Sequence, residues 1–168
     1  MVSGNGKILT TTWAMKKKAN GTYRARVNAR GYKQVKGVHY DESRTAAPVT
    51  NNTTIRIIYV LAILAGWIPY VVDVQGAFLN GRFGDNEHLY LEIPDGFKKY
   101  YDKTKLLKLN CTIYGLKQSA QEFWSELIKA FKTMEFRRSD GDPCCYFKKV
   151  DNRLVICLSW VDDCLFLD

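Results

Sequence analysis

Three short apolar segments near the C-terminus, separated by tight turns, constrain the fold of this 168-residue chain more than any other feature. They read CCYFKK, LVICLSW and CLFLD, with Asp151-Asn152 in the first gap and Val161-Asp162-Asp163 in the second. Runs rich in β-branched and aromatic residues, bounded by Asp and Asn, predict strands, and such short connections join antiparallel neighbours. We therefore expect three antiparallel strands here.

A hairpin is expected near the N-terminus, because Asn20-Gly21 separates a lysine run from a stretch of alternating character. Two helices are expected further on. The first is capped by Thr53 or Thr54, ends at Gly66, and has apolar positions dense enough for burial: Ile57, Ile58, Val60, Leu61 and Leu64. The second follows a capping box formed by Ser119 and Glu122, and its apolar residues have helical spacing up to Met134.

Between the helices, WIPYVVDV (67–74) is predicted to be a buried strand, and short strands are expected at 89–93 and 106–110, before and after a Pro-Asp-Gly turn at 94–96. Antiparallel strands thus alternate with separate helices along the chain. This order places the fold in the α+β class.

The charge is unevenly distributed. Residues 1–50 hold ten basic and two acidic side chains, and residues 51–168 hold fifteen of each, so the net charge of +8 lies in the first 50 residues. A basic segment of this kind favours an anionic partner. A simpler interpretation of the same segment is a basic ribbon that is only solvated by water.

Five cysteines without a C-x-x-C pair, and only two histidines, argue against a zinc site or a disulfide framework. Reduced thiols indicate a cytoplasmic or nuclear protein. The N-terminus lacks the apolar region of a secretory signal, and the longest uncharged run, 57–72, has 16 residues, too few for a membrane span. We expect a protein that is neither secreted nor bound to a membrane.

Carboxylates interrupt the predicted strands at two places. Asp73 lies inside an apolar strand, and Asp162 and Asp163 lie between two others. A carboxylate at the buried end of a sheet is unfavourable unless a cation or donors offset it, and converging carboxylates can hold the two divalent ions of phosphoryl transfer. Taken singly, an Asp-Asp pair is more often turn chemistry, and a strand Asp is often an edge residue. The combination favours a metal site if the strands are neighbours.

Several blocks of the sequence resemble, in order, those of the reverse transcriptase of copia-type (Ty1/copia) retrotransposons. They read YRARVNARGYKQVKGVHYDES, TTIRIIYVLAILAGW, VVDVQGAFLNG, LYLEIPDGF, IYGLKQSAQEFW, DPCCYF and LSWVDD, and cover about residues 13–168. The resemblance implies the fingers and palm of a right-hand polymerase, with an antiparallel palm sheet and packed helices. It assigns about 1–66 and 81–115 to the fingers, and 67–80 and 116–168 to the palm.

The resemblance also implies the site. Asp73, Asp162 and Asp163 match the three catalytic aspartates, which hold two Mg²⁺ ions, or Mn²⁺ in their place. Phe78 matches the aromatic residue under the incoming sugar, and Gln118 matches the glutamine near the incoming nucleotide. Within the fingers block, Arg24, Arg26, Arg30 and Lys33 are candidates for contact with the triphosphate, with no single one assigned.

The implied activity is RNA-directed DNA polymerase within a retrotransposon polyprotein, with an RNA template, a DNA primer or hybrid, and dNTPs as partners. Such a protein acts in cytoplasmic virus-like particles or the nucleus. The family's thumb and ribonuclease H regions are missing from this sequence, so we expect a truncated domain with little activity by itself. Two alternatives stay open, namely a non-catalytic remnant that binds RNA/DNA hybrid, and an unrelated two-metal phosphotransferase or nuclease.

Overall fold

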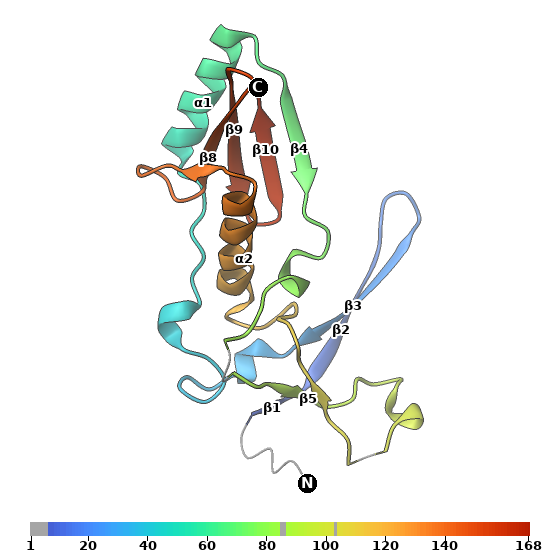
Figure 1. Cartoon of the computed structure of the whole chain (residues 1–168). Helices are drawn as coiled ribbons and strands as arrows, with labels where there is room; N and C mark the ends of the chain where they lie inside the picture. The colour runs from blue at the N-terminus through green and yellow to red at the C-terminus, as the bar shows by residue number, and fades with distance from the viewer. Residues whose placement is uncertain (1–6, 85–86, 103) are drawn as a thin grey trace. The chain divides into compact units, whose positions relative to one another are not determined.

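A computed structural model of the chain describes residues 7–84, 87–102 and 104–168 (Figure 1). The chain divides into two compact units, each discontinuous in sequence. Unit 1 comprises Met1–Ala46 and Phe78–Phe123, and unit 2 comprises Ala47–Ala77 and Trp124–Asp168. Strands and separate helices alternate along the described residues, which confirms the predicted α+β class.

Unit 1 contains two small sheets. In the first, β2 (Thr11–Lys17) and β3 (Tyr23–Ala29) form the predicted hairpin, with Gly21 at φ +83° in its turn. In the second, β5 (Tyr90–Leu91) lies between β1 (Ile8–Leu9), which is parallel to it, and β6 (Leu107–Lys108), which is antiparallel. Short 3₁₀ helices occupy Gly31–Lys33, Glu42–Arg44, Ala77–Leu79 and Lys98–Tyr100.

Two glycines allow the end of β3 to approach the loop before the second helix. The amide of Ala29 donates to the carbonyl of Tyr114 at 2.8 Å. A Cβ at Gly31 would stand 1.9 Å from the Gly115 carbonyl oxygen, and one at Gly115, whose φ is +92°, would stand 2.1 Å from the Ala29 carbonyl oxygen. Both positions therefore require glycine. The contact closes a core of Leu9, Ala29, Leu89, Leu91 and Leu116.

Unit 2 is built on a five-stranded sheet with the order β4-β10-β9-β8-β7, in which every neighbouring pair is antiparallel. The strands are β4 (Pro69–Asp73), β7 (Arg137–Arg138), β8 (Cys145–Val150), β9 (Arg153–Trp160) and β10 (Asp163–Leu167). The last three strands are those that the sequence predicts. Two helices complete the fold, α1 (Asn52–Ala65) and α2 (Ser119–Thr133), and the division between the units falls inside α2.

The two helices pack on opposite faces of this sheet. Residues directly opposite each other on neighbouring strands share a face. Tyr146, Cys157 and Phe166 are such partners, and Phe131 of α2 stacks on Tyr146 with ring centroids 4.3 Å apart. Residues of the other face pack against Ile58 and Ala62 of α1; they are Cys145, Ile156, Leu158 and Leu167.

Helix boundaries differ from the sequence prediction in detail. Asn51, rather than Thr53 or Thr54, caps α1, because its side chain accepts from the amide of Thr53, while Gly66 ends the helix at φ +68° as predicted. Ser119 is already helical, since the carbonyl of Gln118 accepts from the amide of Glu122. The hydroxyl of Ser119 donates to the carbonyl of Ile113 instead.

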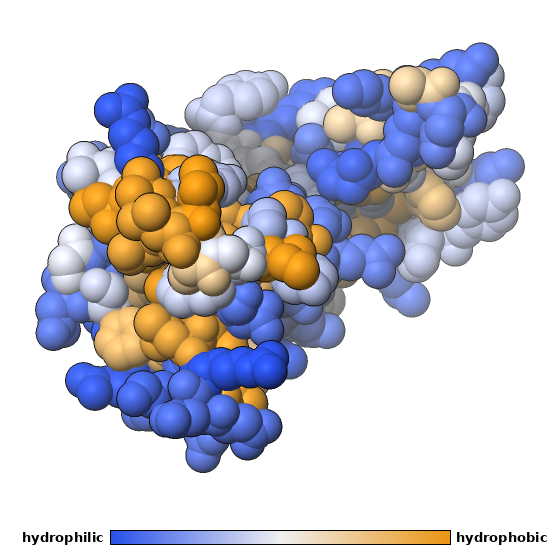
Figure 2. Space-filling view, turned by 90° about the horizontal axis from the view of Figure 1, so that it is seen from above, coloured by the Kyte–Doolittle hydropathy of each residue, from blue (hydrophilic) through white to orange (hydrophobic). Residues whose placement is uncertain are grey.

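Burial in unit 2 also differs from expectation. All five residues of β4 are exposed, because β4 is the edge strand, so the prediction of a buried strand is wrong. Of the five apolar positions of α1 that the sequence singles out, only Ile58 is buried. Figure 2 shows apolar side chains gathered on the face that is seen from above. The exposed apolar residues of α1, of β4 and of the turn between them include Ile57, Val60, Leu61, Ile63, Leu64, Ile68, Tyr70, Val71 and Val72.

No helix among the described residues has the length and apolar character needed to cross a membrane.

Candidate functional site

The two interrupted strands of the sequence are neighbours in unit 2. Strand β10 pairs with β4 so that Asp163 lies directly opposite Asp73. Asp162 belongs to the turn before β10, and its carbonyl accepts from the amide of Val74 at 2.7 Å. Directly opposite side chains of an antiparallel pair project from the same face, with Cβ atoms ~4.5–5.5 Å apart. The structure therefore brings two of the three predicted carboxylates together and places the third in the adjoining turn.

These carboxylates are not buried as the sequence reasoning assumes. Asp73 and Asp163 are exposed, and Asp162 is half-buried, because they stand at the open end of an edge strand pair. Water can therefore solvate both charges. What remains unfavourable is the like-charge pair itself, since directly opposite carboxylates repel each other.

The turn that carries Asp162 is strained. Val161 has φ +55°, in the left-handed region that β-branched residues rarely adopt. Such strain persists only where the surrounding structure imposes it, and it is found preferentially at functional sites. The sequence offers no signal for it, since valine is a poor residue for this position.

Hydrogen bonds from residues 48–51 hold the strands behind this turn. The hydroxyl of Thr50 donates to the carbonyl of Ser159 at 2.7 Å, one residue before Trp160. The carboxylate of Asp142 is buried and accepts from the amides of Asn51 at 2.8 Å and Cys144 at 2.9 Å. Sequence reasoning missed both residues. The signal that could have found Asp142 is the Asp-Pro turn that precedes β8.

A cavity of about 300 Å³ opens beside Asp163 in unit 2. Its wall includes Val71, Trp160, and Tyr59 from α1. Trp160 is 48 % exposed, so it does not serve sheet packing alone. The carboxylate pair thus adjoins an apolar surface large enough to receive part of a ligand.

The donor set is suitable for a hard divalent cation, although the described residues contain no cluster of three or more Asp, Glu, His or Cys side chains arranged as a complete metal site. Mg²⁺ prefers oxygen ligands and is commonly held by only one or two carboxylates together with substrate phosphates. Asp73 and Asp163 meet that requirement.

Behind Asp163, two buried thiols interact. A hydrogen bond between the two thiols raises the pKa of Cys157, and burial raises it further. The same bond lowers the pKa of Cys164, and burial offsets only part of that decrease. Cys157 therefore stays protonated and fills space in the sheet. Neither thiol is accessible, since Cys157 is 0 % and Cys164 3 % exposed.

In unit 1, an aromatic cluster connects two other predicted residues. The rings of Phe78 and Tyr114 meet edge to face with centroids 5.0 Å apart. The guanidinium of Arg26 lies 4.1 Å from the centroid of Tyr114. Phe78 is half-buried, and its carbonyl accepts from the hydroxyl of Thr112. Tyr114, which sequence reasoning did not single out, thus links Arg26 to Phe78.

Gln118 is buried, with 2 % of its surface exposed. Its side-chain amide donates to the carbonyl of His39 at 3.1 Å and accepts from the amide of Gln34 at 2.9 Å. The oxygen of Gln34 in turn accepts from the backbone of Lys117. These bonds fix the loop that carries Tyr114.

The other basic candidates lie on the same segment of unit 1. Arg24 is exposed on β3, Arg30 follows the strand and is half-buried, and Lys33 is exposed in the next 3₁₀ turn. Only Arg26, of these four, has a ring contact among the described interactions. The aspartates and the basic residues thus belong to different units.

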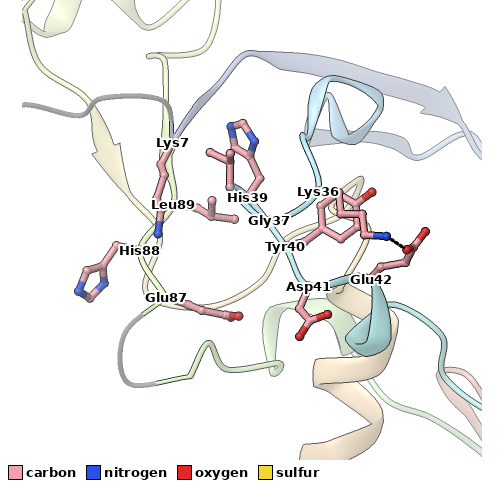
Figure 3. A pocket seen from close by; sticks show the side chains of 11 residues that line it. Lys7, Lys36, Gly37, His39, Tyr40, Asp41, Glu42, Glu87, His88 and Leu89 are labelled. Atoms are coloured by element: carbon pink, nitrogen blue, oxygen red, sulfur yellow. Dashed lines mark hydrogen bonds and ion pairs between the residues drawn. The ribbon is translucent and has the colours of Figure 1, made fainter.

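Unit 1 also has a cavity, of about 370 Å³. Its walls come from residues 36–42 on one side and from Lys7 and residues 87–89 on the other (Figure 3). Its charges have both signs, and Lys36 pairs with Glu42. His39 is nearly buried, and its Nδ1 accepts from the amide of Val35. The cavity contains none of the predicted site residues.

Comparison with known proteins identifies relatives along nearly the whole chain. Residues 2–168 match the family described as reverse transcriptase (RNA-dependent DNA polymerase). The chain is 34 % identical over 165 residues to the retrovirus-related Pol polyprotein from transposon TNT 1-94 of Nicotiana tabacum, which covers 95 % of the chain and 12 % of that protein. It is 33 % identical to the polyprotein from transposon RE1 of Arabidopsis thaliana, over 94 % of the chain and 11 % of that protein.

A more distant relative is the Gag-Pol polyprotein of transposon Ty1-DR4 of Saccharomyces cerevisiae, 27 % identical over 94 % of the chain and 9 % of its own length. The chain therefore spans about a tenth of these polyproteins. No solved structure matches it.

Proposed function

Since the chain belongs to the reverse transcriptase (RNA-dependent DNA polymerase) family of copia-type retrotransposon polyproteins, we propose that unit 2 carries the carboxylates of an RNA-directed DNA polymerase and unit 1 carries nucleotide-binding residues. In that role unit 2 would form most of the palm and unit 1 most of the fingers. The bounds differ in part, because residues 47–66, which the resemblance assigns to the fingers, belong to unit 2, and residues 78–80 and 116–123, which it assigns to the palm, belong to unit 1. The observation that carries the proposal is the direct opposition of Asp73 and Asp163, with Asp162 in the adjoining turn.

In the proposed reaction, the 3′-hydroxyl of a primer attacks the α-phosphorus of a dNTP, and pyrophosphate leaves. Asp73, Asp162 and Asp163 would hold two divalent ions, Mg²⁺ or Mn²⁺. Bound ions of this kind supply the positive charge that stabilises the attacking and leaving oxygens. The residues themselves orient the site, because the β4–β10 ladder holds two of the carboxylates on one face.

Unit 1 would bind the incoming nucleotide. Arg26 and the nearby Arg24, Arg30 and Lys33 offset the charge of a triphosphate. The ring of Phe78, held by Tyr114, presents a rigid apolar edge that would exclude a 2′-hydroxyl. Gln118 would act as a positioning residue, because its amide is already engaged with Gln34 and His39.

The test is primer extension on an RNA template with dNTPs and Mg²⁺, using the chain alone and within its natural polyprotein. The matched variants are Asp73→Asn and Asp140→Asn, since Asp140 lies in an exposed turn of the same unit. The proposal requires that Asp73→Asn abolishes extension by the polyprotein and that Asp140→Asn does not. Equal activity of both variants would show that the carboxylate pair is not catalytic.

A second candidate function is binding of RNA/DNA hybrid without catalysis. It is favoured by the hairpin of unit 1, whose Lys16, Lys17, Lys18 and Arg24 are exposed. Steeply salt-dependent binding of hybrid, together with no incorporation of dNTP by the wild-type polyprotein, would support this candidate over the enzyme.

A further inference from the structure

Unit 1 displays an aromatic surface, made of Trp13, Phe97, Tyr100 and Tyr101, that belongs to neither its core nor the proposed nucleotide site. Phe97, Tyr100 and Tyr101 are 44 %, 68 % and 47 % exposed. They come from the segment that follows β5 (Figure 1). An exposed cluster of rings marks a binding surface more often than an isolated exposed ring does.

The rings are held in place before any ligand binds. The indole N–H of Trp13, on β2, donates to the carbonyl of Asp95 at 2.9 Å. The rings of Trp13 and Phe97 stack with centroids 5.9 Å apart and planes 24° apart, and Tyr100 lies 6.4 Å beyond Phe97. The surface is therefore pre-organised, which lowers the entropy cost of binding.

Positive charge accompanies the rings. Lys98, Lys99, Lys105 and Lys108 are exposed on the same segment, and the ammonium of Lys99 lies 4.8 Å from the centroid of Tyr100. Of the carboxylates near the rings, Asp95 and Asp102 have local partners, and Glu92 lies in the adjoining cavity. Asp95 pairs with Lys98 at 2.6 Å, and Asp102 accepts from the backbone and hydroxyl of Thr104.

A cavity of about 400 Å³ adjoins the rings. Tyr101, Lys98 and Lys105 line it together with the apolar side chains of Ile8, Ile93 and Leu106. Glu92 and Asp102 complete the lining, so the cavity offers an aromatic wall, a hydrophobic floor and charged groups of both signs. This combination suits a planar base that is attached to a phosphate.

We propose that this surface binds single-stranded nucleic acid by base stacking. The identification of that strand as uncopied template rests on the proposed function. Exposed rings stack on unpaired bases, whereas the faces of bases in a duplex are covered by their neighbours. Lysines beside the rings contact the phosphates irrespective of sequence. The surface therefore selects single strands over duplexes and has little preference among bases.

The test is fluorescence anisotropy with labelled single-stranded oligo(U), single-stranded oligo(dT) and an RNA/DNA hybrid duplex, using the 168-residue chain. The variant is Tyr100→Leu with Tyr101→Leu, which keeps apolar volume and removes two stacking faces. The matched control is Tyr70→Leu. That tyrosine is 55 % exposed on β4 and belongs to neither the aromatic surface nor the basic hairpin of unit 1.

The patch variant should bind both single strands about tenfold more weakly or worse, because two bases lose the rings on which they stack. Its affinity for the duplex should stay within twofold of the wild-type affinity. Its melting temperature should equal that of the wild type within error. Lys99→Gln should reduce the slope of log K against log salt by about 1.

An unchanged affinity of the patch variant for single strands would overturn the inference, as would an equal loss in the control. Neither result touches the polymerase proposal, which is decided by the Asp73→Asn variant in primer extension. An equal loss on oligo(U) and oligo(dT) supports stacking, whereas a loss on the duplex of the same size would indicate a general effect of charge and contradict it.

Discussion

Asp163, the first residue of β10, lies directly opposite Asp73, the last residue of β4. The two carboxylates are 90 residues apart in sequence and occupy one face at the open end of the sheet. Without a cation, each raises the electrostatic free energy of the other. Because of this repulsion, the carboxylate pair can be tested by measuring the stability of the chain as well as its activity.

Asp73→Asn should stabilise the chain in metal-free buffer by roughly 0.2–1 kcal/mol, because it removes a like-charge pair directly across two strands. Adding Mg²⁺ should raise the melting temperature of the wild type, since ligands that bind only the native state stabilise it. The variant should respond much less. Thermal melts with and without Mg²⁺, followed by circular dichroism, measure both effects, and an identical Mg²⁺ response of the two proteins would contradict the assignment.

Val161→Gly should stabilise the chain by about 1 kcal/mol. A β-branched residue at φ +55° is strained by ~1–3 kcal/mol, and glycine relieves that strain while adding some entropy to the unfolded chain. Asn152→Gly is the control, because Asn152 has φ +66° in the neighbouring hairpin but asparagine tolerates this region. Urea unfolding compares the two, and a gain no larger at Val161 than at Asn152 would show that the turn is not strained.

Gly115→Ala should be more destabilising than Gly96→Ala, although the two glycines have nearly the same φ, +92° and +90°. At Gly96 nothing lies within 4 Å of an added Cβ, so only the backbone cost of ~1–2 kcal/mol applies. At Gly115 the Cβ would overlap the Ala29 carbonyl, which adds roughly 1–3 kcal/mol for overpacking. Equal free energies of unfolding would mean that the two loops separate easily.

Stability should fall as the pH rises above 10, and part of the fall should come from Tyr146. Burial raises the pKa of Tyr146 from 10.0 to about 12. The unfolded chain therefore loses this proton at a lower pH than the folded chain does, so stability present below pH 10 is lost as the pH approaches 12. Urea unfolding at pH 8, 10 and 11 should show a shallower decline for Tyr146→Phe, and parallel curves would contradict the burial of the hydroxyl.

Ile63→Lys with Leu64→Lys should reduce self-association and leave the fold intact. These side chains are 79 % and 78 % exposed on α1, so their replacement costs little packing and interrupts the apolar surface. Ile58→Lys, at 8 % exposure on the same helix, should unfold unit 2. Light scattering and circular dichroism distinguish these outcomes. Loss of structure in the double variant would place those residues in the core.

Much of the local structure follows from the sequence alone. The Asn20-Gly21 turn has one favourable hairpin geometry, and the last three strands are separated by turns too short for anything but antiparallel pairing. The α+β class follows from the order of these elements. The caps were less predictable, because several polar residues precede α1 and only the folded chain shows that Asn51 accepts from Thr53.

Part of the candidate site was predictable as well. The aspartates stood out because they interrupt apolar strands, and that anomaly is visible without any structure. That Asp163 lies opposite Asp73 depends on the register of β4 with β10, which a sequence separation of 90 residues does not determine locally. Thr50 and Asp142, which bond to backbone groups 109 and 91 residues away, had no comparable signal.

The sequence by itself thus determined which segments become strands and helices, since turn chemistry and periodicity act over a few residues. Only the tertiary structure decided their surroundings. It placed β4 at an exposed edge instead of in the interior, buried Gln118 among backbone partners, and left one side of α1 in water. Burial and register depend on which distant segments meet, and that is a property of the whole packing and not of local preference.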